Sequence, residues 1–161
     1  MFELIPDPDT FNEIEQWLYA VLSPSIREQR QVDRAVRRGF AKVFGNQGGA
    51  VGWQPLAEAT VAERLRMGYP GRRPILIRTG EYSQSFTQDG HPDHVFRVSR
   101  ANSAVQFEVG SAEERVQWLE YGTTRMPARP VVDLDDRTEN EILNGLDDIC
   151  DRLFDRVVNG A

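Results

Sequence analysis

The feature that most constrains the fold is a stripe of apolar side chains close to the C-terminus. These side chains recur three or four residues apart, which is the spacing of one face of an α-helix: Ile142, Leu143, Leu146, Ile149, Cys150, Leu153, Phe154 and Val157. Burying these eight side chains gains about 1.5–3 kcal/mol each. That total is less than the cost of ordering the roughly twenty residues of the helix, at about 1–2 kcal/mol per residue for the backbone alone. The helix must therefore pack on a sheet or on a neighbouring subunit, and Cys150 is expected to be buried as a small hydrophobe. Asp135 is expected to cap it, with Asp136 and Glu139 near its positive end.

Two further helices are expected in residues 1–44. The first has an apolar face and ends at Pro24; the face comprises Phe11, Ile14, Leu18, Val21 and Leu22. The second begins at once, since Ser25 and Glu28 have the spacing of a capping box. Its apolar face comprises Val32, Val36, Phe40, Val43 and Phe44.

The middle of the chain mixes β-type and helical patterns. Residues 94–99 and 104–109 alternate in polarity on either side of a turn-rich link, which predicts an antiparallel hairpin with one buried face. A short strand is expected at 75–77. Helices are expected from Pro55 to about Met67 with Gly68 as the C-cap, at 81–86 as a short helix or turn, and at 113–121.

These patterns together predict one α+β domain over 1–161, a length that suits a single domain. A small, mainly antiparallel sheet is expected to be covered by helices. The N-terminal helical pair takes residues 1–44 and the α+β core takes residues 53–161, ending in the long C-terminal helix.

The net charge of −6 disfavours a general nucleic-acid binder, which needs a basic surface. One helix face is nevertheless basic, and it could meet nucleic acid or an acidic partner: Arg27, Arg30, Arg34, Arg37 and Arg38. The other interpretation is a solvated face, partly neutralised by Glu28 and Asp33. No N-terminal signal peptide and no apolar run of about 20 residues is visible, so we expect a cytoplasmic protein without a membrane span.

No convergent set of catalytic groups is evident. His91 and His94 flank Asp93 in a turn without a second ligand cluster, so a metal site is not expected. The acidic cluster Asp133, Asp135 and Asp136 suits helix capping better than magnesium. Ser83 and Ser85 lack a histidine base in a motif, and the glycine-rich residues 45–52 lack the ending of a phosphate loop. We therefore expect no enzyme activity, no metal and no cofactor.

The run from Trp118 to Pro130 combines aromatic rings, a carboxylate and two arginines on a stiff turn. Such residue types make contacts between proteins. Gly122 is expected to stop the preceding helix, and Trp118 and Leu119 are expected to serve the core.

Three separated patterns have the order and spacing of a known family. They are Trp53-x-Pro55-Leu56 with Thr60 and Arg64; Leu76 with Thr79-Gly80, Tyr82 and Ser85; and Gly110-Ser111 followed by Glu120-Tyr121-Gly122-Thr123 and Met126-Pro127-Ala128-Arg129-Pro130. From Trp53 onward the chain resembles the phage virion-morphogenesis (tail-completion) family and related neck or minor tail proteins of long-tailed bacteriophages. Tail completion, neck adaptor and minor tail component all remain open.

The resemblance implies a non-enzymatic structural protein that forms a ring, a hexamer or dodecamer. Its partners would be a head connector or adaptor and a tail terminator or tail-tube protein. It would be assembled in the cytoplasm of a bacterial host and end in the virion. DNA would pass through an acidic lumen without specific binding. The expected contact residues are Glu120, Tyr121, Thr123, Arg125, Arg129 and Pro130.

Two other hypotheses stay open. One is a small nucleic-acid-binding or regulatory protein that uses the arginine-rich helix. The other is an enzyme of unrecognised type built on His91, Asp93 and His94.

Overall fold

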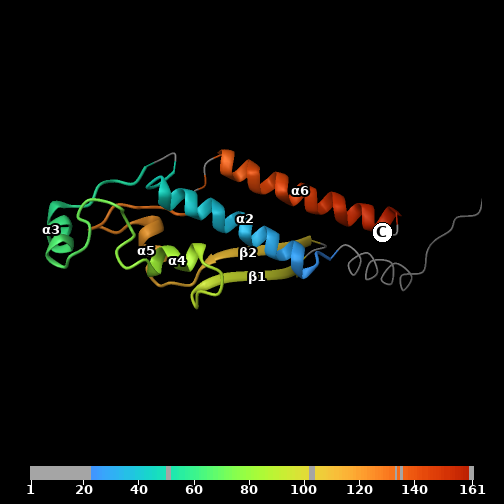
Figure 1. Ribbon diagram of the computed structural model, residues 1–161, viewed down its shortest axis with the longest axis horizontal. Coiled ribbons are helices and arrows are strands. Elements are labelled where there is room, and N and C mark those ends of the chain that lie inside the picture. The colour runs from blue at the N-terminus through green and yellow to red at the C-terminus, as the bar shows by residue number, and fades with distance from the viewer. Residues whose placement is uncertain (1–22, 50–51, 102–103, 133, 135, 160–161) are drawn as a thin grey trace, which may run out of the picture.

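Two long helices lie side by side along the molecule, and a hairpin with two short helices packs against one of them (Figure 1). The computed structural model describes residues 23–49, 52–101, 104–132, 134 and 136–159. Its elements are α2 (Ile26–Gly45), α3 (Glu58–Arg66), α4 (Glu81–Thr87), β1 (His94–Ala101), β2 (Ala104–Ser111), α5 (Val116–Tyr121) and α6 (Asp136–Asn159). The predicted α+β class and the long C-terminal helix are confirmed. The helix expected at 11–22 and the cap expected at Asp135 lie outside the described residues.

Helix α2 begins with the capping box that the sequence predicts. The Glu28 backbone N–H donates to the Ser25 hydroxyl at 3.3 Å, and the Ser25 backbone N–H donates to the Glu28 carboxylate at 2.6 Å. Two of the first free N–H groups are thereby paired. Val32, Phe40, Val43 and Phe44 are buried along one side, which fixes the face that α2 turns to the rest of the protein.

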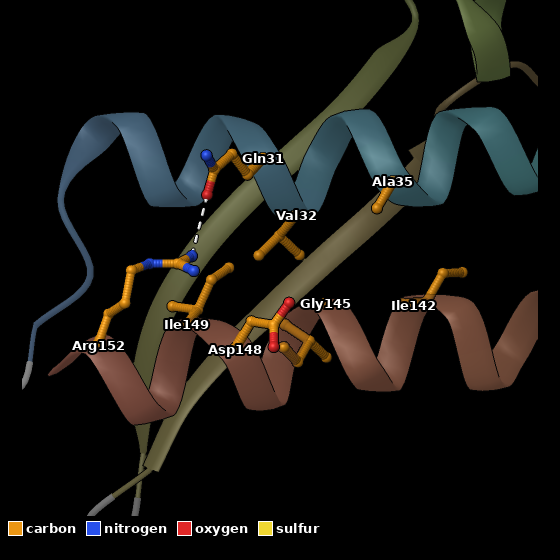
Figure 2. A pocket seen from close by; sticks show the side chains of 9 residues that line it. Gln31, Val32, Ala35, Ile142, Gly145, Asp148, Ile149 and Arg152 are labelled. Atoms are coloured by element: carbon orange, nitrogen blue, oxygen red, sulfur yellow. Dashed lines mark hydrogen bonds between the residues drawn. The ribbon is translucent and has the colours of Figure 1, made fainter. Parts of the chain in front are cut away.

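Helix α6 packs antiparallel on α2. Lys42 near the end of α2 pairs with Glu141 near the start of α6, and Glu28 pairs with Arg156 at the opposite ends. Val32 packs with Ile149 and Leu153. Between these contacts the helices leave a hollow of about 280 Å³ beside Ala35 and Gly145, and Arg152 reaches across it to Gln31 (Figure 2).

Only part of the α6 stripe is covered. Leu143, Phe154 and Val158 are exposed, and so is Cys150. The prediction that Cys150 is buried is therefore wrong. Among the described elements, α2 makes the main contact with α6 and Phe107 of β2 adds to it, and together they cover a narrower arc than the stripe occupies.

The main core lies between α2, α4 and the segments that follow α2 and α5. Its aromatic rings meet edge to face, with centroids of Phe40 and Phe86 at 5.1 Å and of Tyr82 and Phe86 at 5.4 Å. Phe44 contacts the Trp53 ring at 5.6 Å, which ties α2 to the chain beyond it. Val131, fully buried, joins the same cluster.

The hairpin is confirmed and extends beyond the predicted bounds. Strands β1 and β2 form an antiparallel two-stranded sheet in which Phe96 faces Val109 and Val98 faces Phe107. Phe107 packs on the cluster between α2 and α6, whereas Arg97 and Glu108 pair on the solvent side. The side chains of the hairpin that face the helices are partly buried.

Three predicted elements differ from the structure. Helix α5 starts at Val116 instead of Glu113. Helix α3 starts at Glu58 instead of Pro55, since Ala57 before it is extended (φ −60°, ψ 145°), and the carbonyls of Gln54 and Pro55 accept hydrogen bonds from Arg129. Residues 75–77 form no strand. The Ile75 N–H donates to the Gln47 side chain, and Leu76 adopts a φ of 60°, which interrupts an extended backbone.

Candidate protein interface

The segment from Trp118 to Pro130 forms a short helix and a tight turn. Helix α5 ends at Gly122, whose φ of 72° favours glycine. A β-carbon there would lie 2.7 Å from the Ala128 nitrogen, so the returning chain also requires a glycine. Thr123 and Met126 close the turn with two backbone hydrogen bonds of 2.8 and 3.2 Å. The turn is thus held by its own backbone.

Three of the expected contact residues point inward and brace this turn. Glu120 accepts a hydrogen bond from the Val131 N–H at 2.7 Å. Arg129 is 4% exposed and donates to the carbonyls of Gln54 and Pro55, each at 3.2 Å. Burial lowers the pKa of Arg129. The Pro130 carbonyl accepts from the Trp53 indole at 2.8 Å. The side chains of Glu120 and Arg129 and the carbonyl of Pro130 bind their own chain, so these residues can act on a neighbour only through the turn that they hold.

The other three expected residues are exposed. Tyr121 is 87% exposed, and Thr123 and Arg125 lie on the outer side of the turn. Trp118, three residues before Tyr121 on the same helix, is 50% exposed. The prediction that Trp118 serves the core is wrong, whereas Leu119 is buried as expected. Since residues three apart share a helix face, α5 presents an aromatic pair, Trp118 and Tyr121.

A groove of about 480 Å³ runs beside the turn. It lies between α3, the segment 54–57, the segment 76–78, Tyr82 and the turn residues 125–129. Its apolar lining includes Leu56, Leu76, Leu119 and Met126. Its charged lining comprises Glu63 and five arginines: Arg64, Arg78, Arg115, Arg125 and Arg129. We call this the arginine groove.

Two buried hydrogen-bond donors on the wall of the arginine groove have no acceptor among the described residues. They are the Tyr82 hydroxyl and the Arg64 Nε–H group. The other end of the Arg64 guanidinium donates to the carbonyls of Pro74 and Ile77. Burial, with the nearby carboxylates of Glu120 and Glu113, raises the pKa of Tyr82, so its hydroxyl stays protonated.

A second polar cluster, which the sequence analysis missed, lies between α2 and the start of β1. His94 Nε2 is 2.9 Å from Asp33 Oδ1, and Arg37 Nε donates to the other oxygen of that carboxylate at 2.8 Å. His94 Nδ1 is 3.2 Å from the Ser85 carbonyl. Asp33 and His94 are 61 residues apart, and no local motif marks the pair. The cluster joins two elements across the core.

His91, Asp93 and His94, the residues of the enzyme hypothesis, do not form one cluster. His91 lies beside Glu81 at 3.3 Å and accepts a hydrogen bond from the Asp93 backbone N–H, while His94 turns to Asp33. Within the described ranges, no three His, Cys, Asp or Glu side chains gather as a metal site. Ser85 is fully buried and donates to the Tyr82 carbonyl, and Ser83 donates to the Gly80 carbonyl. Of the acidic cluster, Asp133 and Asp135 lie outside the described residues.

The basic face of α2 is exposed and its acidic residues are not. Arg27, Arg30, Arg34 and Arg38 are exposed. Glu28 is buried and binds Ser25 and Arg156, and Asp33 is buried between Arg37 and His94. Glu28 and Asp33 are expected from the sequence to neutralise part of this face. Of the arginines on the face, Arg37 alone is paired with one of these two carboxylates, that of Asp33.

Among the described residues, no helix has the length and apolar character needed to cross a bilayer. A scan of protein-family models, a search of curated proteins and a search of solved structures each return no match for this chain.

Proposed function

We propose that the protein is a structural subunit that assembles into a ring and joins the head connector to the tail of a long-tailed bacteriophage, in the neck or at the tail end. The assembly role is supported by the exposed surfaces of the subunit. The placement in a phage is supported by the resemblance of its three sequence patterns to tail-completion, neck and minor tail proteins.

The observation that carries the assembly role is the presence of two separate exposed apolar surfaces. One is the aromatic pair on α5, with Val132 beside it at 54% exposure. The other is the outer side of α6, where Leu143, Phe154 and Val158 are 47%, 63% and 60% exposed. A closed ring of identical subunits uses two different surfaces, one on each side of every subunit. The residues that the structure describes leave both surfaces exposed, which suits that requirement.

The aromatic pair suits a contact surface because its support is stiff. Glu120, Arg129 and Pro130 fix the turn to the core through the hydrogen bonds described above. A surface that is ordered before binding loses less conformational entropy when a partner binds. Tyr and Trp are also the side chains that contribute most often to binding energy at protein interfaces.

The role in the virion is mechanical. Repetition of a net acidic subunit around a ring would give a lumen through which DNA slides without specific binding. The ring would contact a connector or adaptor on one side and a tail terminator or tail tube on the other.

The test removes the aromatic pair and leaves the fold. Trp118→Ala with Tyr121→Ala should give folded subunits by circular dichroism that join purified heads to tails poorly. Met67→Ala, which shortens an exposed apolar side chain on another part of the surface, is the control and should join them normally. Normal yields of joined particles with the aromatic double variant would contradict the proposal.

The exposed arginine stripe on α2 supports a second candidate function, nucleic-acid binding. Arg27 to Arg38 spans about 16 Å of helix, and B-DNA carries a phosphate about every 1.7 Å along its axis. Arg34→Glu with Arg38→Glu should then abolish a salt-sensitive affinity for duplex DNA. Lack of binding by the unaltered protein near physiological salt would remove this candidate.

A further inference from the structure

The charge of the arginine groove is opposite to that of the protein. Five arginines and one glutamate line it in a chain of net charge −6, and Glu113 next to the lining pairs with one of these arginines, Arg115. Arg78 and Arg125 are exposed, so their charges face solvent and any incoming ligand. An acidic ligand is therefore favoured over a neutral or basic one.

The groove also offers what a peptide needs besides charge. Leu56, Leu76 and Met126 provide an apolar lining. The hydroxyl of Tyr82 and Nε–H of Arg64 lack acceptors in the described part of the chain, and each side chain is at least nine-tenths buried. These two donors are themselves shielded from solvent, so the contacts that the groove offers to a bound segment are its apolar lining and its exposed guanidinium groups.

The N-terminal segment of this chain has the complementary chemistry. Residues 1–10, Met-Phe-Glu-Leu-Ile-Pro-Asp-Pro-Asp-Thr, carry Glu3, Asp7 and Asp9 and no lysine or arginine. Apolar side chains flank Glu3 on both sides, and the two prolines of this sequence favour an extended backbone. We propose that the arginine groove binds residues 1–10 of a second copy of the chain. This inference rests on the proposed self-association and adds a further contact to the two apolar surfaces described above.

The position of the groove favours a second copy over the segment's own groove. The described chain starts at Ser23, at the N-terminal end of α2, whereas α3 and α5 lie beyond the other end (Figure 1). The 20 residues of α2 span about 30 Å, so the segment would have to run back along all of α2 to reach its own groove. In a ring, the arginine groove of a neighbouring subunit can lie close to the segment, which then does not have to run back along α2.

The α2 stripe is the competing basic surface. It is a row of arginines on one exposed helix face. The hollow of about 350 Å³ beside it is lined by Arg34, Arg37, Arg38, Ala41, Thr87 and Asp89, without the leucines and the methionine of the arginine groove. An acidic segment there would be held mainly by charge, and screening by salt weakens such contacts.

The experiment measures the fluorescence anisotropy of a labelled peptide with the sequence of residues 1–10. It is titrated with the full chain carrying Glu3→Lys, Asp7→Lys and Asp9→Lys, whose own segment cannot compete. We expect saturable binding. Adding Arg78→Glu and Arg125→Glu to that chain should weaken binding at least tenfold, and a peptide with the three lysines should restore it. Arg30→Glu with Arg34→Glu on the α2 stripe is the matched control and should change binding less than twofold.

Sedimentation velocity then compares the unaltered chain with the triple-lysine chain at equal concentration. We expect the unaltered chain to self-associate and the triple-lysine chain to do so less. No peptide binding, or binding that is lost only with the α2 control, overturns the proposal. Groove-dependent peptide binding by a chain that sediments as a monomer in both forms assigns the segment to its own groove and overturns the second copy. Trp118→Ala with Tyr121→Ala lies outside the groove and should leave peptide binding intact, so failure of ring assembly and failure of this inference are separable.

Discussion

The indole N–H of Trp53 donates to the carbonyl of Pro130 at 2.8 Å, although the residues are 77 positions apart. This hydrogen bond joins the loop after α2 to the end of the turn that carries the candidate interface. The Trp53 ring also packs edge to face on Phe44. One side chain therefore connects the core of α2 to the surface that we propose makes contacts.

Trp53→Phe should lower the free energy of unfolding by about 1–3 kcal/mol, because it keeps a ring on Phe44 and leaves the Pro130 carbonyl without its donor. Urea denaturation measures the change. Trp118→Phe is the same substitution at a half-exposed position and should change stability by less than about 0.5 kcal/mol. Equal effects at the two positions would show that the hydrogen bond contributes little.

Two helical glycines should respond in opposite directions to alanine. A β-carbon at Gly39 would lie 2.9 Å from Cγ2 of the buried Thr138, so Gly39→Ala forces α2 and α6 apart and should cost about 1–3 kcal/mol. A β-carbon at Gly145 meets nothing within 4 Å, and Gly145→Ala should stabilise α6 by about 0.5–1 kcal/mol. Thermal unfolding of both variants measures this. A stable Gly39→Ala protein would contradict the close packing of the two helices.

The two arginines of the turn should have different effects. Arg129→Ala leaves the carbonyls of Gln54 and Pro55 without a donor and should lower the free energy of unfolding by about 1–3 kcal/mol. Arg125→Ala removes an exposed side chain and should leave stability within about 0.5 kcal/mol. Urea denaturation separates the two. If Arg129→Ala unfolds like the unaltered protein, its side chain is available for another partner.

Elements specified by neighbouring residues could be predicted from the sequence. The capping box of Ser25 and Glu28, the hairpin and the glycine after α3 each depend on a pattern a few residues long. Gly68 has the expected left-handed backbone, with a φ of 80°. Local chemistry decides such features, and tertiary contacts do not override it.

Features set by distant contacts could not be predicted. The segment before α3 is bound by Arg129, and the backbone N–H of Ile75 is bound by Gln47. Helix α5 has six residues, too few turns for its periodicity to say which side Trp118 faces. The same holds for the candidate site. The run from Trp118 to Pro130 could be singled out, but the arginine groove comes from segments that are far apart in sequence.

The capping box also predicts a dependence of stability on pH. Burial pushes the pKa of Glu28 upward, but hydrogen bonds from the Ser25 side chain and backbone and the charge of Arg156 outweigh it and hold the pKa below 4.5. A carboxyl whose pKa is lower in the folded state stabilises the fold above its unfolded pKa, and this stabilisation is lost as the pH falls through the folded value. Glu28→Gln removes the titrating group, so the gap in unfolding free energy between the two proteins should be largest near neutral pH. It should narrow as the pH falls below about 4.5.

Glu114→Gln, at an exposed position, is the control for general charge effects. Urea denaturation at a series of pH values measures both gaps, and a Glu28→Gln gap that stays constant down to pH 2 would mean that the hydrogen bonds to Ser25 and Arg156 do not favour the charged carboxylate.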